Sequence, residues 1–458
     1  MKFRSLPLGP LCLAMLFWTG VAAAGQAPNL AELRVTGDWQ IQVTVRLDAA
    51  KPGGGVKTVT ETLAVSPAAL LTIKAERHAS LPLFNAQAGG WSKGPALQGV
   101  RAQECATLHL LVPGSLTLRT GPEADAPLLE LGKDYAADLA WGTFGRLAGG
   151  RIREGQAVFA SYQCGELRID SVILTPEGRI LVRKGEPRSA APLQPPLKEG
   201  ERRLANIWLP GRVSKFSPDH LFPITETAYP EPPPEHPSAA EKLLPKTMQK
   251  IRDGRPLRIL AWGDSVTVGT YLPDPARERW QEQFVTRLRQ RFPTARIELL
   301  TEAWGGRNTG SYLAEPPGSV HNYQEKVLDT KPDLIVSEFV NDAGLTPEQV
   351  ETRYGKLLAD FTKIGAEWII LTPHYVRPDW MGLTKERDID EDPRPYVKGL
   401  RRFAAQHQVA LADAALRYGR LWRQGIPYSV LMLNSINHPD ARGMSLFADS
   451  LMALFPSQ

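Results

Sequence analysis

Cysteine and membrane-spanning segments are scarce in this sequence. Only three of its 458 residues are cysteine, and none clusters with histidine at metal-ligand spacing, so no bound metal is expected. No glycine-rich loop has phosphate-binding spacing, and no cofactor is expected. Beyond the N-terminus, no apolar run is long enough to cross a bilayer. The basic residues are scattered without an aromatic stripe between them, which argues against nucleic acid or anionic lipid as the main partner.

The N-terminus has the pattern of a secretory signal peptide. Lys2 and Arg4 give it a positive start, residues 11–21 are apolar, and residues 22–24 are alanines that suit a cleavage site. We expect residues 1–24 to be removed and the protein to be exported, to the periplasm or the extracellular space. An uncleaved membrane anchor is the alternative. Without Lys2 and Arg4, the 54 basic residues become 52 against 49 acidic ones, and the formal charge falls from +5 to +3.

Two cysteines, Cys105 and Cys164, stay in the chain after such a cleavage. In an oxidising compartment they would form one disulfide if their Cβ atoms approach each other, and would otherwise remain two buried free thiols. The sequence leaves both arrangements open.

Residues 25–190 have the alternating, β-branched pattern of a β-rich domain. Gly, Pro and Asp residues separate its expected strands, among them residues 33–36, 41–45, 56–65, 157–162 and 169–174. We predict a sandwich or a barrel that acts as an accessory domain. Residues 191–250 form a proline-rich connector, in which residues 204–209 and 221–224 are apolar enough to pack on a domain.

Residues 251–458 alternate strands with helices. Short apolar runs predict strands at residues 259–262, 297–300, 334–339, 368–371 and 409–411. Apolar residues at helical spacing predict helices within residues 280–292, 350–361, 396–406 and 444–451. This alternation implies a parallel sheet covered by helices on both faces, which is a three-layer α/β fold.

Polar motifs stand where functional groups gather in such sheets, at the carboxyl ends of strands. Gly263-Asp264-Ser265 directly follows the first strand, and Gly305-Gly306-Arg307-Asn308 comes after the second. Asn341-Asp342 follows the third strand, and Asn437-His438-Pro439-Asp440 precedes the last helix. Each motif alone is common, since a serine after an aspartate usually belongs to a helix cap. The four motifs in this order predict one site.

In these motifs, residues 258–455 resemble the GDSL/SGNH hydrolase family. The resemblance implies a flavodoxin-like three-layer fold with one active-site residue from each motif. Ser265 would be the nucleophile and His438 its general base. The backbone N–H groups of Ser265 and Gly306 and the side-chain amide of Asn341 would stabilise the oxyanion.

The sequence departs from this family beside the histidine. Family members commonly carry an aspartate three residues before it, and this chain has Ser435 there. Two arrangements are open for the group that orients His438. One is a Ser–His dyad whose imidazole is held by a backbone carbonyl or by Asn434, and the other is an acid from elsewhere, such as Asp440.

The resemblance and the signal peptide together predict an exported serine esterase that deacylates, and in particular deacetylates, a carbohydrate through an acyl-enzyme on Ser265. Two alternatives share the fold: an O-acyltransferase, in which a sugar hydroxyl replaces water, and a noncatalytic glycan-binding protein that has lost its acid. Trp304, Arg307 and Trp380 are candidates for a sugar-stacking wall, and His374 for the lining of the cleft. The oligomeric state is left open.

Overall fold

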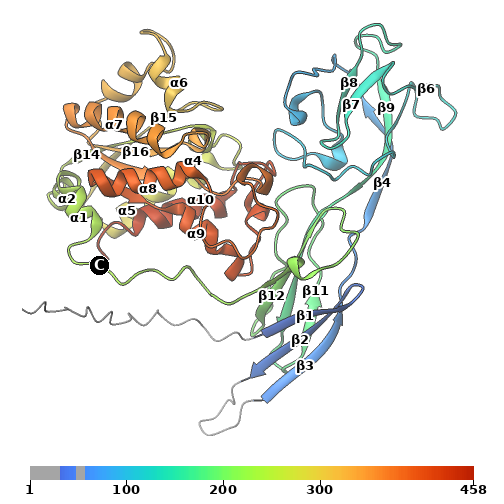
Figure 1. The fold of residues 1–458 in the computed structure, drawn as a ribbon, viewed down its shortest axis with the longest axis horizontal. Coiled ribbons are helices and arrows are strands. Elements are labelled where there is room, and N and C mark those ends of the chain that lie inside the picture. The colour runs from blue at the N-terminus through green and yellow to red at the C-terminus, as the bar shows by residue number, and fades with distance from the viewer. Residues whose placement is uncertain (1–30, 48–56, 458) are drawn as a thin grey trace, which may run out of the picture.

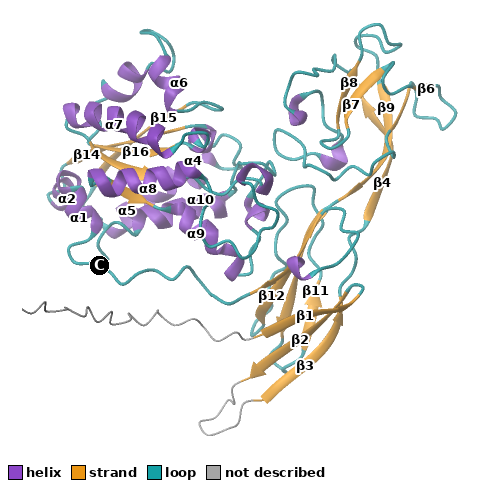
Figure 2. Ribbon diagram, in the orientation of Figure 1, coloured by secondary structure: helices purple, strands orange, loops and turns teal. Residues whose placement is uncertain are grey.

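The structure, a computed structural model, describes residues 31–47 and 57–457 (Figure 1). The predicted signal peptide, residues 1–24, lies outside these described residues. Two antiparallel β parts precede an α/β part in the chain (Figure 2). Within the described ranges, no helix is both long and apolar enough to cross a membrane.

The first β part is a sandwich of two antiparallel sheets. One sheet has the order β1-β2-β3, formed by Ala31–Gly37, Gln40–Leu47 and Lys57–Ala64. The other has the order β11-β10-β12-β13, formed by Ile180–Arg183, Leu167–Leu174, Arg202–Pro210 and Leu221–Pro223. Alternate side chains of β2 point to one face of its sheet. They share a hydrophobic cluster with the second sheet, which includes Ile41, Val43, Val45, Val172, Ile207 and Leu209.

The second β part holds the remaining strands of the N-terminal side. Its main sheet has the order β4-β9-β5-β6, formed by Leu70–His78, Val158–Gly165, Thr117–Arg119 and Leu128–Leu129. A separate pair joins β7 and β8, which are Tyr135–Asp138 and Thr143–Arg146. Short helical turns η1 and η2, Gly90–Ser92 and Gln98–Val100, follow β4. The buried side chains of this part belong to the same cluster as those of the α/β part.

In the described part of the predicted β-rich region, residues 25–190, the antiparallel strands are confirmed, but they form two bodies with separate cores. Residues 25–30 and 48–56 of this region lie outside the described residues. The predicted connector, residues 191–250, also differs from expectation, because β12 and β13 lie inside it. The apolar run at residues 204–209 pairs antiparallel with β10, for example Ile207 with Asp170, and completes the sandwich. The pattern of apolar residues could not distinguish a strand that joins this sheet from a segment that packs on its surface.

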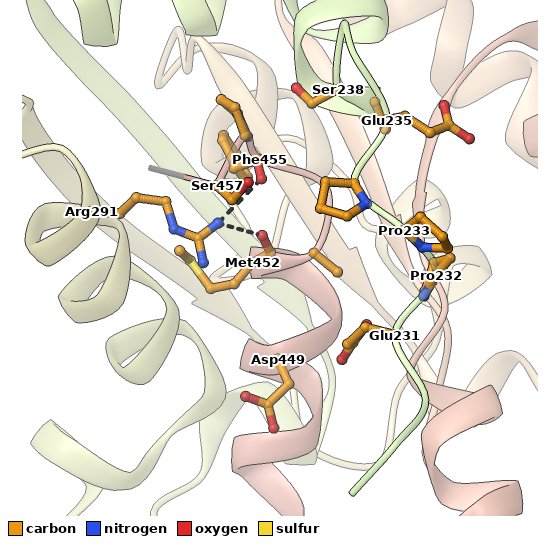
Figure 3. Close-up of a pocket in the computed structure, with 14 residues that line it drawn as sticks. Glu231, Pro232, Pro233, Glu235, Ser238, Arg291, Asp449, Met452, Phe455 and Ser457 are labelled. Carbon is orange, nitrogen blue, oxygen red and sulfur yellow. Dashed lines mark hydrogen bonds between the residues drawn. The ribbon is translucent and has the colours of Figure 1, made fainter. Parts of the chain in front are cut away.

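The proline-rich end of the connector runs along the α/β part. The carboxylate of Glu231 accepts from the guanidinium of Arg417, with Oε2 and Nη2 2.8 Å apart. A hollow of about 470 Å³ separates residues 231–235 from the end of the last helix (Figure 3). In this hollow, Arg291 donates to the carbonyl oxygens of Met452 and Phe455 at 2.8 and 3.2 Å. The connector is thus packed against the domain that follows it.

The α/β part has a parallel sheet with the order β15-β14-β16-β17-β18. Its strands are β14 (Pro256–Gly263), β15 (Arg296–Ala303), β16 (Leu334–Glu338), β17 (Glu367–Leu371) and β18 (Ala410–Ala412). All neighbouring pairs are parallel, and the order is that of flavodoxin-like folds. The predicted fold class and its five strands are confirmed.

Helices cover this sheet. They are α1 (Ala239–Leu243), α2 (Pro245–Arg252), α3 (Ser265–Val268), α4 (Pro275–Glu278), α5 (Trp280–Arg291), α6 (Thr309–Ala314), α7 (Pro347–Ile364), α8 (Pro395–His407), α9 (Ala414–Arg420) and α10 (Ala441–Met452). Shorter turns are η3 (Pro218–His220), η4 (Gln324–Leu328), η5 (Val340–Asp342), η6 (Pro378–Met381), η7 (Leu421–Arg423) and η8 (Tyr428–Leu431). Helix α5 packs against α10, and α7 packs against α8. The four predicted helices are α5, α7, α8 and α10, so their apolar stripes are the faces turned to the core.

Candidate active site

Ser265 lies at the carboxyl end of β14, which has a neighbouring strand on each side. The chain turns from this strand directly into α3, whose first residue is Ser265. Oδ1 of Asp264 caps α3 by accepting the backbone N–H of Val266 at 3.1 Å. A Cβ on Gly263 would lie 2.1 Å from Oγ1 of Thr267, so only glycine fits the end of the strand. This close turn holds the Ser265 hydroxyl at the edge of the sheet.

His438 faces Ser265 from the loop before α10. Its Nε2 lies 3.1 Å from Oγ of Ser265, within hydrogen-bond distance. The ring of Tyr271 stacks on the imidazole, with centroids 4.1 Å apart and an interplanar angle of 6°. Oδ1 of Asn434 accepts three backbone N–H groups of the loop, including that of His438 at 2.9 Å. Stacking and loop bonds together hold the imidazole beside the hydroxyl.

Burial lowers the pKa of His438 to about 4. The imidazole is therefore neutral at neutral pH, and one of its nitrogens has a lone pair for the hydroxyl proton. For Nε2 to accept that proton, the ring hydrogen must sit on Nδ1. The pair has the geometry of a nucleophile and its general base, provided that this tautomer is selected.

Gly306 and Asn341 complete the predicted set. Gly306 follows β15 with a φ of +72°, in the left-handed region that favours glycine. The backbone N–H and the side-chain Nδ2 of Asn341, in η5, donate to Oδ2 of Asp264 at 2.9 and 3.0 Å. A hollow of about 560 Å³ is lined by all four predicted residues, Ser265, Gly306, Asn341 and His438. The structure therefore brings the four predicted residues together around one hollow.

Asp264 connects the serine turn with Asn341. Its side chain is completely buried, and burial raises the pKa of its carboxyl, against the effect of the N–H groups that donate to it from Asn341 and Val266. An amide nitrogen carries two hydrogens, so the bond from Nδ2 of Asn341 to Asp264 leaves one hydrogen for the hollow. Asp264 therefore aims this amide as well as capping α3.

Neither side chain that the sequence suggested for orienting the imidazole reaches Nδ1 of His438. Asn434 binds backbone N–H groups of the loop. Asp440 caps α10, and its Oδ2 lies 2.6 Å from Nη2 of Arg442. Nδ1 is buried and has no hydrogen-bond partner among the described residues. Neither the side chain of Asn434 nor that of Asp440 therefore orients the imidazole through Nδ1, and both predictions are wrong on this point.

A glutamate from the second β part stands at this nitrogen instead. Oε2 of Glu104 lies 3.2 Å from Nδ1 of His438, and 51% of the Glu104 side chain is exposed. The distance is within hydrogen-bond range, although the ring N–H is not aimed at the oxygen, and the pair is ionic only when His438 is protonated. No motif in the sequence surrounds Glu104, and its contact with His438 depends on how two parts of the chain pack, so sequence analysis did not find it.

The wall of the hollow contains two tryptophans. Trp380, predicted as a sugar-stacking residue, lines it together with Trp91 of η1. The two rings lie 5.6 Å apart at 61°. Trp91 was not singled out in the sequence, because an isolated tryptophan in a loop is as often a core residue.

Three other candidates lie elsewhere among the described residues. Arg307 and Trp304 lie against each other, 5.1 Å from guanidinium carbon to ring centre, and neither lines this hollow. His374 is fully buried, and burial lowers its pKa well below the usual value. Its Nε2 lies 2.8 Å from the carbonyl oxygen of Asn437. His374 thus supports the loop of His438 and does not line the cleft.

Of the two arrangements open for the cysteines, the structure has free thiols. Cys105 and Cys164 are both buried and unpaired. Burial raises the pKa of Cys105 to about 12 and that of Cys164 to about 11. Both thiols are therefore protonated at neutral pH and are poor nucleophiles.

Comparison with known proteins agrees with this geometry. Residues 261–446 match the GDSL-like Lipase/Acylhydrolase family. The match begins inside β14, ends inside α10, and includes Ser265, Gly306, Asn341 and His438. No curated protein matches the chain.

Several solved structures are similar to part of this chain. A two-domain esterase active on acetylated mannans, co-crystallised with mannopentaose, has 19% identity and a TM-score of 0.37, over 46% of this chain and 52% of that one. A variant of an acetyl xylan esterase from Geobacillus stearothermophilus has 17% identity and a TM-score of 0.33, over 43% and 93%. A lipolytic G-D-S-L protein from Veillonella parvula has 19% identity and a TM-score of 0.33, over 43% and 98%.

The match spans about half the length of the two-domain esterase. The five-stranded parallel sheet has the order of flavodoxin-like folds, and the four motifs meet at its carboxyl edge. With the family match, these observations identify residues 261–446 as a domain of the GDSL-like lipase/acylhydrolase family, a family of ester-hydrolysing enzymes.

Proposed function

We propose that this protein is an exported serine esterase that removes acyl groups, in particular acetyl groups, from a carbohydrate. The observation that carries the proposal is the 3.1 Å separation of Oγ of Ser265 and Nε2 of His438. The pair lies in a hollow that Gly306 and Asn341 also line. Export is supported by the signal-peptide pattern of residues 1–24.

In the proposed reaction, Nε2 of His438 takes the hydroxyl proton of Ser265 as Oγ attacks the ester carbon. The carbonyl oxygen becomes an oxyanion near the N–H groups of Ser265, Gly306 and Asn341. The C–O bond then breaks, the alcohol leaves with the proton from His438, and the acyl group stays on Ser265. Water attacks this acyl-enzyme by the same steps, which releases the acid and restores the hydroxyl.

The two tryptophans of the hollow support a carbohydrate as the alcohol part of the ester. Trp380 exposes 47% of its surface, and the guanidinium of Arg377 lies 5.4 Å from its ring centre. An exposed indole face can pack on the apolar face of a sugar ring. Polar side chains of the same lining, such as Ser92 and Asn437, suit sugar hydroxyls.

Acetate release from acetylated mannan and acetylated xylan tests this proposal. The wild-type protein is expected to release acetate from at least one of them, and the Ser265→Ala variant from neither. Transfer of acetyl groups to an added sugar at the expense of acetate would indicate the acyltransferase alternative. Folded protein that binds the polysaccharide but releases no acetate would indicate the glycan-binding alternative.

The Asn341→Ala variant is expected to lose about 100- to 1000-fold in kcat on p-nitrophenyl acetate, because one oxyanion donor is removed. KM is expected to change little, since the amide acts on charge that develops in the transition state. The matched control is Asn322→Ala, which removes a buried amide that donates to the carbonyl of Glu315 at 2.9 Å, outside the hollow. Wild-type kcat in folded Asn341→Ala would contradict the oxyanion role.

The Trp380→Ala variant tests the carbohydrate part. Loss of one stacking surface is expected to raise KM for an acetylated polysaccharide about 3- to 10-fold, with no effect on p-nitrophenyl acetate, which has no sugar ring. Steady-state kinetics on both substrates measures the difference. Trp39→Ala is the control, because Trp39 stacks on Phe216 in the sandwich. Equal effects of Trp380→Ala on both substrates would argue against a sugar subsite.

A further inference from the structure

The loop that carries His438 is turned toward the second β part. Ser435, three residues before the histidine, has Oγ 2.7 Å from Oγ1 of Thr107. These residues are 328 positions apart in the sequence, so the contact exists only because the two parts pack together. Ser435 stands where related hydrolases commonly carry an orienting aspartate. In this protein it instead binds Thr107 of the second β part.

The segment of the second β part that faces this loop is a tight hairpin, residues 101–106. An antiparallel bridge between Arg101 and Ala106 closes it. Glu104 lies in its turn with a φ of +61°, a left-handed conformation that favours glycine and is unfavourable for glutamate. Residues held in such an unfavourable backbone conformation are often found at functional sites, and the side chain of Glu104 lies beside His438.

Two hydrogen bonds dock the hairpin on the histidine loop. The backbone N–H of Gln103 donates to the carbonyl of Leu433 at 3.1 Å, and the thiol of Cys105 donates to the carbonyl of Asn434 at 2.9 Å. The donors are the residues on either side of Glu104. The backbone of Glu104 is therefore anchored on both sides, against the loop that holds the imidazole.

The imidazole needs an acceptor at the nitrogen that Glu104 faces. Nδ1 of His438 is buried without a hydrogen-bond partner in the described chain, which is costly for a ring N–H. Oε2 of Glu104 is 3.2 Å away on a half-exposed side chain. Because half of this side chain is exposed, packing leaves its carboxylate room to turn toward the N–H.

We propose that Glu104 is the positioning acid of the active site, supplied to the α/β domain by the second β part. This inference rests on the proposed function. The carboxylate would accept the hydrogen of Nδ1 and so select the tautomer in which Nε2 is free to take the proton of Ser265. It would also stabilise the imidazolium that forms when His438 holds that proton. The second β part then belongs to the catalytic machinery.

Other charged groups do not obscure a test of this role. Apart from Glu104, the titratable groups beside the ring include Tyr271, which stacks on it, and His374, whose pKa the charge of His438 affects. Further out, Glu338, Tyr418 and Asp264 act on Tyr271, and Arg377 acts on Cys105. Each of them is unchanged in a Glu104 variant. A difference in the pKa of His438 between the wild type and such a variant therefore reports the effect of Glu104.

The experiment compares the full-length wild type with Glu104→Gln, Glu104→Asp and the control Glu123→Gln, which alters an exposed glutamate in another turn of the same part. For Glu104→Gln we expect kcat on p-nitrophenyl acetate to fall about 10- to 100-fold with KM within twofold. The proton affinity of His438, followed by NMR of histidine-labelled protein, should fall about threefold to tenfold, because a nearby carboxylate favours the charged ring. The acid limb of kcat/KM should move to lower pH.

Glu104→Asp keeps the charge and is expected to recover part of both losses, while Glu123→Gln should behave as the wild type. An active wild type whose Glu104→Gln variant keeps its kcat and its His438 pKa would overturn the inference and leave the proposed function standing. A fall in kcat without any change in the pKa, which Glu104→Asp does not relieve, would also overturn it, since this indicates a purely structural role. A wild type that neither hydrolyses esters nor reacts with a fluorophosphonate would instead refute the proposed function.

Discussion

Replacement of Ser265 by alanine is expected to lower kcat on p-nitrophenyl acetate by about 10⁴- to 10⁶-fold. The reason is that Oγ of Ser265 is the hydroxyl beside Nε2 of His438, at 3.1 Å, and no other group can form the acyl-enzyme in the proposed reaction. The fold should persist, because the substitution removes one oxygen and leaves the cap of α3, which Asp264 provides.

The matched control for this variant is Ser115→Ala. Ser115 lies in the second β part outside the hollow, and its hydroxyl donates to the carbonyl of Val112 at 2.7 Å. Wild-type kcat is expected for this control. Hydrolysis by folded Ser265→Ala at more than about a hundredth of the wild-type rate would mean that another residue is the nucleophile.

Replacement of His438 by alanine is expected to reduce kcat by about the same factor, 10⁴ to 10⁶. Serine alone is a weak nucleophile at neutral pH and needs the base that removes its proton. Because the two side chains act as one unit, the double variant of Ser265 and His438 should be no slower than either single variant. Steady-state kinetics of the three variants measures this.

The control for the histidine is His407→Ala. His407 also contacts a glutamate, with Nε2 2.6 Å from Oε1 of Glu351, but it lies at the end of α8 outside the hollow. It is expected to leave kcat unchanged. If the losses in Ser265→Ala and His438→Ala multiply in the double variant, the two residues act independently and the proposed pair is wrong.

The α/β part was predictable because its signals are local. Each of its strands contains short stretches of apolar residues, and the four helices have an apolar stripe that repeats at helical spacing. In a parallel sheet the carboxyl ends of strands share one edge, so motifs such as Gly263-Asp264-Ser265 and Asn341-Asp342 could be placed near each other from their order alone. Their meeting in one hollow follows from topology.

The features that were missed depend on contacts between parts of the chain. The hairpin with Glu104 reaches His438 only after the second β part has packed on the α/β part, and Trp91 reaches the hollow by the same packing. The strands β12 and β13 join a sheet with partners earlier in the sequence. A residue pattern records which segments are apolar, but not which other segment they will contact.

The second β part thus has a role that its strand pattern does not reveal. It shares a hydrophobic cluster with the α/β part, it supplies a wall of the hollow through Trp91, and it places Glu104 beside the imidazole. The sandwich has its own core and contributes no residue to the lining of the hollow among the described residues.

Reaction of the wild-type protein with a fluorophosphonate probe, followed by mass spectrometry of its peptides, tests the central claim most directly. Such probes bond covalently to a serine hydroxyl that a base activates. We predict one adduct, on Ser265, and none after the substitution His438→Ala. An adduct on a different residue, or folded wild-type protein without any adduct, would contradict the account.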